Sequence, residues 1–311
     1  MAAVDLSTEL CGIELGNPTV LASGVLGTSK SLLQMVARAG AGAVTTKSVS
    51  LDPMPGHNNP ITVGFEAGLL NAVGYSNPGM RESAQEFKDL ENVGVPVIAS
   101  VIGSGVGDFV KVVDGLWGQG FAAIEISLSC PHTPGFGMMA GQNTPSYTRQ
   151  VTSAVRRVTS IPIFVKLSPD TPDIASVAKA AEESGADGIT ATNTMGPGMI
   201  INIEARRPVL DFKVGGISGP ALRPIAVRCV YDIYESVRIP IIGTGGVSTG
   251  RHAIEMLMAG ARAVGIGTAV CTRGVDVFSA VCREMEEWME GNNYSSVQEL
   301  IGAAHELHPE Q

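Results

Sequence analysis

A cysteine at the end of an apolar strand is the first residue of this sequence whose setting suggests chemistry. Residues 122–128 alternate in the manner of a strand that stops at Cys130-Pro131, and a glycine-rich run follows over residues 133–142. Glycines let such a loop move, so the thiol is expected to lie under a lid. An isolated cysteine is more often a buried structural residue, and its neighbours must decide between the two readings. Cys130 is therefore the candidate catalytic residue.

Two lysines stand where strands are predicted. Lys47 ends the apolar strand 43–47, and Lys166 lies near the centre of the strand 163–167. A charge inside a barrel is costly unless it is paired, whereas a lysine at a strand end is commonly a surface charge. Because helices cover the strands of a barrel, we predict that Lys166 is buried and faces an anionic or electron-rich ligand.

Side-chain amides and hydroxyls add to these candidates. Asn71 lies between small residues in the segment 68–74, and Asn193-Thr194 ends the strand 186–194. An amide offers both donors and an acceptor, so it can hydrogen-bond a planar polar ring. An ordinary turn asparagine is the alternative for Asn71.

Two glycine clusters late in the chain predict a phosphate site. Gly243-Thr244-Gly245-Gly246 ends one strand, and Gly267-Thr268 ends the next. Backbone N–H groups at two such turns, with a following helix N-terminus, bind ligand phosphates in barrels of parallel strands. No G-x-G-x-x-G motif followed by an acidic residue is present, so a Rossmann dinucleotide site is not expected.

The elements that must position these residues alternate along almost the whole chain. Short apolar strands and amphipathic helices follow one another, which predicts repeated βα units. The expected strands are 18–22, 43–47, 96–101, 122–128, 163–167, 186–194, 240–247 and 263–266. The expected helices are 31–39, 81–93, 108–119, 146–158, 174–184, 221–236, 250–259 and 275–290, with a last covering helix over 295–305.

This order predicts an α/β fold, a single (β/α)8 TIM barrel domain over residues 1–311. Such barrels typically need about 250 residues, and their catalytic groups lie at the carboxyl ends of the strands. We expect an extended loop after strand 2 and a lid loop after the Cys130 strand. The first of these, residues 52–80, far exceeds the usual connection of about 4–6 residues and is expected to carry function.

Composition and charge exclude several classes of function. The net charge of −9, with no basic stripe, makes nucleic acid an unexpected partner. The 5 cysteines lack any C-x-x-C spacing, so no metal site held by this chain is expected. Their odd number and the absence of a signal peptide predict a reducing cytoplasm. No apolar run approaches the roughly 18 residues of a membrane span, so membrane attachment is not expected either.

Taken together, these motifs resemble the dihydroorotate dehydrogenase family. The resemblance is to its cytosolic class with a cysteine base, and within that class to the archaeal-like catalytic subunit of the two-subunit NAD-linked type. The motifs that carry it are Ala22-Ser23-Gly24, Thr46-Lys47, the run from Leu70 to Gly79, Ser129-Cys130-Pro131, the run from Val165 to Pro169, Asn193-Thr194, the run from Gly215 to Pro220, and the run from Gly243 to Val247.

The resemblance implies FMN as cofactor and the oxidation of dihydroorotate to orotate in pyrimidine biosynthesis. A hydride would pass from C6 of the substrate to flavin N5, while Cys130 removes the proton from C5. The substrate-binding residues implied are Lys47, Asn71, Ala72, Gly74, Asn193 and Thr194. The cofactor-binding residues implied are Ala22, Ser23, Lys47, Ser127, Lys166, Ser218, Gly219, Gly245, Gly246, Gly267 and Thr268.

The resemblance also implies partners. Enzymes with a cysteine base either work alone with fumarate or pair with a subunit that carries FAD and a [2Fe–2S] cluster and passes electrons to NAD. The run from Gly215 to Pro220 is closer to the paired class. We therefore expect a homodimer that can recruit such a subunit into a heterotetramer.

Two positions depart from the family pattern Asn-x-Ser-Cys-Pro-Asn, because this chain has Ser127 and His132. A serine hydroxyl is shorter than an amide and offers one donor, so a contact at Ser127 is lost or bridged by water. His132 either donates to a substrate carboxylate or carbonyl, or is a lid residue without a catalytic role.

The same departures leave two alternatives open. Ser129-Cys130-Pro131-His132 and Gly141-Gln142 also resemble the pyrimidine-reducing barrel of dihydropyrimidine dehydrogenases, which act on uracil and thymine. The iron–sulfur segments of that family are missing from this sequence. A catalytically silent barrel that binds FMN or a partner is the other alternative, and Cys130 together with the lysines and amides argues against it.

Overall fold

The computed structural model describes residues 4–116, 118–128, 134–135 and 142–306. The predicted catalytic Cys130, its neighbour His132 and much of the predicted lid lie outside these ranges. The strand that precedes Cys130 and the helix that follows the lid both lie within these ranges.

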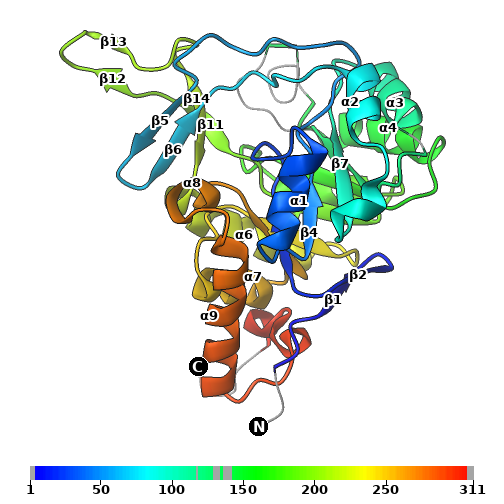
Figure 1. Ribbon diagram of the computed structural model, residues 1–311, viewed down its shortest axis with the longest axis vertical. Helices are drawn as coiled ribbons and strands as arrows, with labels where there is room; N and C mark the ends of the chain where they lie inside the picture. Colours follow the sequence, from blue (N-terminus) through cyan, green and yellow to red (C-terminus); the bar gives the residue numbers. More distant parts are fainter. Residues whose placement is uncertain (1–3, 117, 129–133, 136–141, 307–311) are drawn as a thin grey trace.

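Parallel strands close into an eight-stranded barrel wrapped by helices, which confirms the predicted (β/α)8 architecture (Figure 1). In chain order the barrel strands are β3 (Thr19–Leu21), β4 (Ala43–Thr45), β7 (Val97–Val101), β8 (Ala123–Ser127), β9 (Ile163–Leu167), β10 (Gly188–Ala191), β15 (Ile241–Thr244) and β16 (Ala263–Ile266). Each strand pairs in parallel with its neighbours, and β16 pairs with β3 to complete the ring. All the strand ends that carry predicted site residues therefore meet at one mouth of the barrel.

Four of the described helices begin at a side chain that caps them. The side chains of Ser29, Thr144, Asp173 and Thr249 each accept a hydrogen bond from a backbone N–H group in the first turn that follows. The helices are α1 (Lys30–Arg38), α2 (Met80–Glu86), α3 (Val106–Gly115), α4 (Pro145–Arg156), α5 (Ile174–Glu182), α6 (Arg223–Tyr234), α7 (Gly250–Met258), α8 (Ala269–Arg273) and α9 (Val277–Gly291). Their apolar faces pack on the outer side of the strands in one large core.

The barrel interior changes from apolar to polar along the strands. At the amino ends, Val20, Ala43 and Phe164 pack against Leu10 and Leu15. These two leucines come from a hairpin of β1 (Thr8–Leu10) and β2 (Ile13–Leu15), which fills this end of the barrel. Two residues further along, six of the eight strands carry a buried polar side chain: Thr45, Ser100, Glu125, Lys166, Thr190 and Thr244. Because alternate residues face the same side of a strand, this polar layer lies directly above the apolar one.

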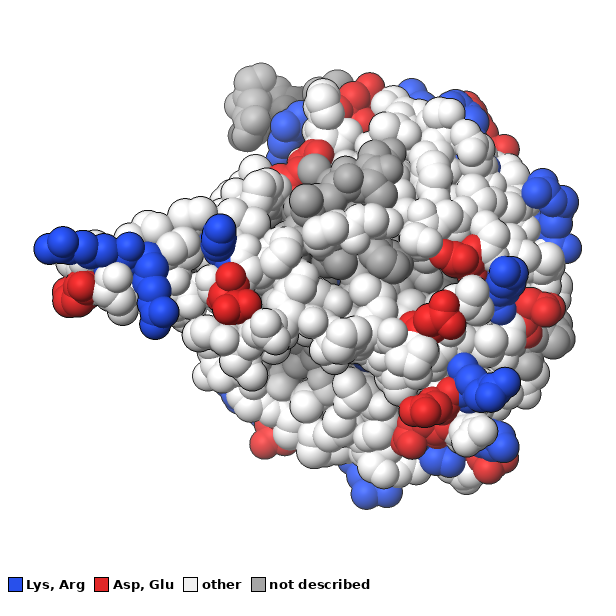
Figure 2. All heavy atoms as spheres, turned by 90° about the horizontal axis from the view of Figure 1, so that it is seen from above, with Lys and Arg blue, Asp and Glu red and all other residues white. Residues whose placement is uncertain are grey.

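A second sheet projects from the carboxyl mouth of the barrel (Figure 1). Its antiparallel strands are β5 (Thr62–Phe65), β6 (Gly68–Asn71), β11 (Met195–Gly198) and β14 (Gly215–Ser218), and a hairpin of β12 (Ile201–Asn202) and β13 (Arg207–Pro208) extends it. The long excursion over residues 52–80 is thus partly ordered as a hairpin. Figure 2 shows the extension as an arm on which Lys and Arg side chains gather.

Two predicted helices are broken. The segment 81–93 forms α2 and then the 3-10 turn η1 (Leu90–Val93), because Asp89 has a left-handed φ of 55° that ends regular helix. The segment 295–305 forms the turns η4 (Val297–Leu300) and η5 (Ala303–His305), which Ile301 in an extended conformation and Gly302 at a φ of 77° separate. Among the described residues, no helix has the length and apolar character needed to cross a membrane.

Candidate functional site

A cavity of about 600 Å³ opens at the carboxyl ends of the barrel strands. Pockets for small molecules and cofactors commonly have volumes of about 300–1,000 Å³. Its lining comes from the turns after β3, β4, β10, β15 and β16, from the ends of β8 and β9, and from the projecting sheet. The cavity therefore has walls from both the barrel and the extension.

Most of the predicted site residues meet in this cavity. The lining includes Ala22, Ser23, Lys47, Asn71, Gly74, Ser127, Lys166, Asn193, Thr194, Ser218, Gly219, Gly245, Gly246, Gly267 and Thr268. Ala72 is fully buried instead, in a small core with Leu70 and Leu210 under the projecting sheet. Cys130 lies outside the described residues. The contacts of all these residues with a ligand stay predictions.

The charge of the lining contrasts with that of the whole chain. Lys47, Lys166 and Arg273 are the charged residues of the described lining, which contains no Asp or Glu. The chain as a whole carries a net charge of −9. The carboxylates of Glu125 and Glu284 pair with two of these cations but are not themselves among the lining residues, so the lining favours anionic ligands.

Lys166 is buried at the floor of this cavity and has a partner that the sequence did not single out. Its side chain is 7% exposed, and its Nζ lies 3.5 Å from Oε1 of Glu125, whose side chain is 4% exposed. Register places Lys166 between Ser127 on β8 and Thr190 on β10. A buried charge needs such a partner, so Glu125 makes it possible for the barrel to hold a cation here.

Hydroxyl groups continue the polar floor beside this pair. The Oγ atoms of Ser23 and Ser48 lie 3.2 Å apart, and those of Ser48 and Ser100 lie 3.0 Å apart. By contrast, the buried Oγ1 atoms of Thr190 and Thr244 have no hydrogen-bond partner among the described residues. Of these two residues, Thr244 lines the cavity, so its unpartnered hydroxyl is placed where a ligand could pair with it.

The walls toward the extension are held by hydrogen bonds between elements. Asn71 donates from Nδ2 to the carbonyl of Gly216 at 3.2 Å, which joins β6 to β14. Thr268 donates from Oγ1 to Oγ of Ser218 at 2.8 Å, which joins the projecting sheet to the turn after β16. The side-chain oxygen of Asn193 accepts from the N–H group of Thr194 at 2.8 Å. These bonds fix the polar side chains before a ligand arrives.

The turn after β15, residues 245–248, is called the anion loop below. Gly245 has a φ of 138° and Gly246 a φ of 74°, and an added Cβ at either would lie 2.6 Å from the side chain of Ala226 or Arg223. Within the described chain, the N–H groups of Gly245, Gly246 and Gly267 donate to no protein acceptor. Unpaired backbone N–H groups in a glycine turn at a cavity wall are what a phosphate group requires.

Sequence reasoning missed three residues of this site. Glu125 stands in the segment 122–128 with the parity of Ala123 and Ser127, so alternation alone places it inside the barrel. Ser48 directly follows the predicted Lys47 and carried no further signal. Arg273 follows the Gly267-Thr268 turn by one short helix, and only folding brings it back to the cavity.

Comparison with known proteins agrees with this geometry. The family model described as dihydroorotate dehydrogenase matches residues 5–289. A relative from Methanothermobacter thermautotrophicus, named dihydroorotate dehydrogenase B (NAD(+)), catalytic subunit, is 48% identical over 303 residues, 97% of this chain and 99% of the relative. Proteins of the same name are 46% identical over 301 residues in Methanosarcina acetivorans, with 96% of both chains covered, and 44% identical over 299 residues in Pyrococcus abyssi, covering 96% of this chain and 99% of that one. This chain belongs to the dihydroorotate dehydrogenase family.

Proposed function

We propose that this chain oxidises dihydroorotate to orotate in pyrimidine biosynthesis, as the FMN-binding catalytic subunit of a larger enzyme. The observation that carries this proposal is the cavity lined by Lys47, Lys166 and Arg273 without a described carboxylate, in a chain of the dihydroorotate dehydrogenase family. Both the substrate, a carboxylate, and FMN, a phosphate ester, are anions. We propose that residues 1–311 form a single FMN-binding domain.

The described residues fit a phosphorylated flavin. The unpaired N–H groups of the anion loop and of Gly267 suit its phosphate, and the unpartnered hydroxyls of Thr190 and Thr244 lie at the polar floor. The other proposed contacts come from Ala22, Ser23, Lys47, Ser127, Lys166, Ser218, Gly219 and Thr268. When bound, FMN supplies a two-electron acceptor that no amino-acid side chain provides.

The protein's own groups bind the substrate and move one proton. Lys47 neutralises the substrate carboxylate, and the amides of Asn71 and Asn193 with Thr194 hydrogen-bond the dihydropyrimidine ring. Cys130 removes the proton from C5 while C6 loses a hydride, so the ring gains its double bond. A free thiol has a reference pKa of about 8.5, so this base works best near or above neutral pH or in a step concerted with hydride loss.

We propose that partner subunits complete the enzyme. The relatives are named catalytic subunits, a name that implies a second, electron-transferring subunit in those proteins. For this chain we propose a homodimer that recruits a subunit with FAD and a [2Fe–2S] cluster, through which electrons reach NAD. The chain's net charge of −9 fits neither nucleic acid nor an anionic membrane surface as a further partner.

Anaerobic reduction of the bound flavin tests this function. Dihydroorotate should bleach the flavin absorbance in a stopped-flow experiment, whereas dihydrouracil should not. Cys130→Ala should slow bleaching by about 10²- to 10⁴-fold, the usual contribution of a general base. Cys11→Ala is the matched control, because that thiol donates to the carbonyl of Asp187, outside the cavity.

The other outcomes discriminate the alternatives. Bleaching by dihydrouracil alone would assign the chain to pyrimidine reduction, and a loaded flavin that neither compound bleaches would contradict both activities. Equal slowing in the Cys130 and Cys11 variants would remove the special role of Cys130.

A further inference from the structure

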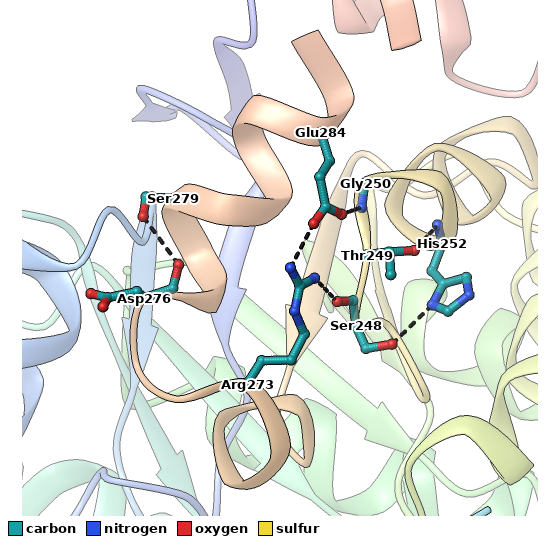
Figure 3. Close-up of polar contacts among 8 residues, drawn as sticks. All are labelled: Ser248, Thr249, Gly250, His252, Arg273, Asp276, Ser279 and Glu284. Carbon is teal, nitrogen blue, oxygen red and sulfur yellow. Dashed lines mark hydrogen bonds and ion pairs between the residues drawn. The ribbon is translucent and has the colours of Figure 1, made fainter. Parts of the chain in front are cut away.

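The anion loop is supported from behind by residues outside the predicted site (Figure 3). Arg273, the last residue of α8, donates from Nη1 to the carbonyl of Ser248 in the loop. Its Nη2 lies 2.6 Å from Oε1 of Glu284 on α9. Arg273 is also among the residues that line the cavity, so the residue that holds the loop borders the ligand space.

Glu284 uses both carboxylate oxygens in this arrangement. While Oε1 pairs with Arg273, Oε2 accepts from the N–H group of Gly250 at 2.6 Å. Burial alone would raise the pKa of Glu284, but the hydrogen bonds from Arg273 and Gly250 outweigh it and hold the pKa below its ordinary value. The carboxylate thus stays charged at neutral pH. It accepts from the first N–H group of α7, which has no partner within the helix.

A second contact fixes the same loop on its other side. The Oγ of Ser248 lies 3.1 Å from Nδ1 of His252, in the first turn of α7. The N–H group of His252 in turn donates to Oγ1 of Thr249, the cap of that helix. The end of the anion loop is therefore held by α7 through His252, and by α8 and α9 through Arg273 and Glu284.

We propose that Arg273, oriented by Glu284, is a positioning residue that makes the cavity select flavins carrying a phosphate over flavins without one. By holding the Ser248 carbonyl, the guanidinium keeps the N–H groups of Gly245 and Gly246 in the wall, and it brings a positive charge to that end of the cavity. Planar guanidinium groups suit such two-partner geometry, which an ammonium group cannot reproduce. The selectivity rests on the proposed binding of FMN in this cavity.

Binding of FMN and of riboflavin to the flavin-free chain tests the proposal. The two ligands share the ring and ribityl chain and differ in the phosphate, and flavin fluorescence follows both. Arg273→Gln should weaken FMN binding by at least about tenfold, the loss expected for a charge-assisted contact, and change riboflavin binding by less than about twofold. Glu284→Gln should weaken FMN binding in the same sense. Arg149→Gln is the matched control, because Arg149 pairs with Glu183 on the outer helices at 2.8 Å.

Several results would overturn the proposal. These are an unchanged FMN affinity in Arg273→Gln, an equal loss of FMN and riboflavin affinity, and tighter FMN binding in Glu284→Gln. Arg273→Lys keeps the charge without the planar fork and should also bind FMN weakly, so full affinity in this variant would reject the positioning role. Melting of the flavin-free variants, followed by circular dichroism, checks that each is folded.

Turnover is not needed for this measurement. A chain that binds FMN selectively through Arg273 but leaves dihydroorotate unreacted would keep the inference and remove the proposed activity. A chain that binds neither flavin would instead remove the FMN proposal itself.

Discussion

At the scale of single residues, the ion pair between Lys166 and Glu125 is the least ordinary feature of this barrel. Both side chains are nearly inaccessible, at 7% and 4% exposed, and they come from adjacent strands. Burying two charges is expensive, and removing either partner leaves the other buried and unpaired. The pair places a cation under the cavity and stabilises the fold only while both members are present.

A double-mutant cycle tests that dependence. Lys166→Met should lower the free energy of unfolding by about 3–5 kcal/mol, because it leaves the Glu125 carboxylate buried and unpaired. The double variant Lys166→Met/Glu125→Leu should lose less free energy of unfolding than Lys166→Met alone. Urea unfolding of the flavin-free protein measures each value. Exposed Arg149 and Glu183 provide the comparison cycle, expected to give about 0–1 kcal/mol. Strictly additive losses at Lys166 and Glu125 would show that the two are not coupled.

The sequence could predict one half of this pair but not the contact. Lys166 stood out because a lysine interrupts an apolar run, and Glu125 could have been placed inside the barrel by the same alternation. Their meeting depends on the register of β8 against β9, which local pattern does not contain. Arg273 was invisible for a similar reason, since its partners Ser248 and Glu284 are 25 and 11 residues away in the chain.

At the scale of elements, barrel strands were more predictable than the extension. β9 and β16 have the predicted bounds, because strands buried on both faces read as largely apolar runs, which Lys166 alone interrupts in β9. β1, β2, β11 and the hairpin of β12 and β13 are as short as several barrel strands but are only partly buried, so they do not read as apolar runs. Breaks in helices at Asp89 and Gly302 depend on backbone conformations that tertiary packing selects.

The anion loop offers a test at this scale. Gly246→Ala should lower stability by about 1–3 kcal/mol and weaken FMN binding, because the new Cβ meets the side chain of Arg223 at 2.6 Å. Gly94→Ala has the same kind of backbone strain, with a φ of 88°, but nothing lies within 4 Å of its Cβ. It should therefore lose stability without losing FMN affinity. Thermal unfolding measures the stability and flavin titration the FMN affinity. Equal FMN affinities of the Gly246→Ala and Gly94→Ala variants would argue against close packing of the loop.

At the scale of the whole molecule, the net charge of the chain is opposite in sign to the charged residues of the cavity lining. The net charge of −9 repels an approaching dianion, while the lining cations attract it only at close range. The chain's overall charge could be read from the sequence. The sequence also predicted Lys47 and Lys166 at a site for anions. It did not show that Arg273 joins them or that the described lining lacks carboxylates, because these residues lie far apart in the chain and only the fold collects them.

A change in ionic strength distinguishes the electric field of the net charge from that of the lining cations. Raising it from about 0.01 M to about 0.1 M shortens the Debye length from about 30 Å to about 10 Å and screens the distant charges first. The association rate constant of FMN should therefore rise, while that of uncharged riboflavin should stay constant. Stopped-flow fluorescence measures both rates. A slower FMN association at higher salt would mean that the cavity cations already dominate along the approach.

The hairpin at the amino end of the barrel has a consequence for how substrate and product reach and leave the cavity. In the part of the chain that the structure describes, Leu10 and Leu15 fill that end. Ligands therefore enter by the opposite mouth, where the cavity opens. Dihydroorotate that arrives and orotate that leaves must then use the same opening. One opening for both means that orotate must leave before the next dihydroorotate can enter, whatever route the electrons take.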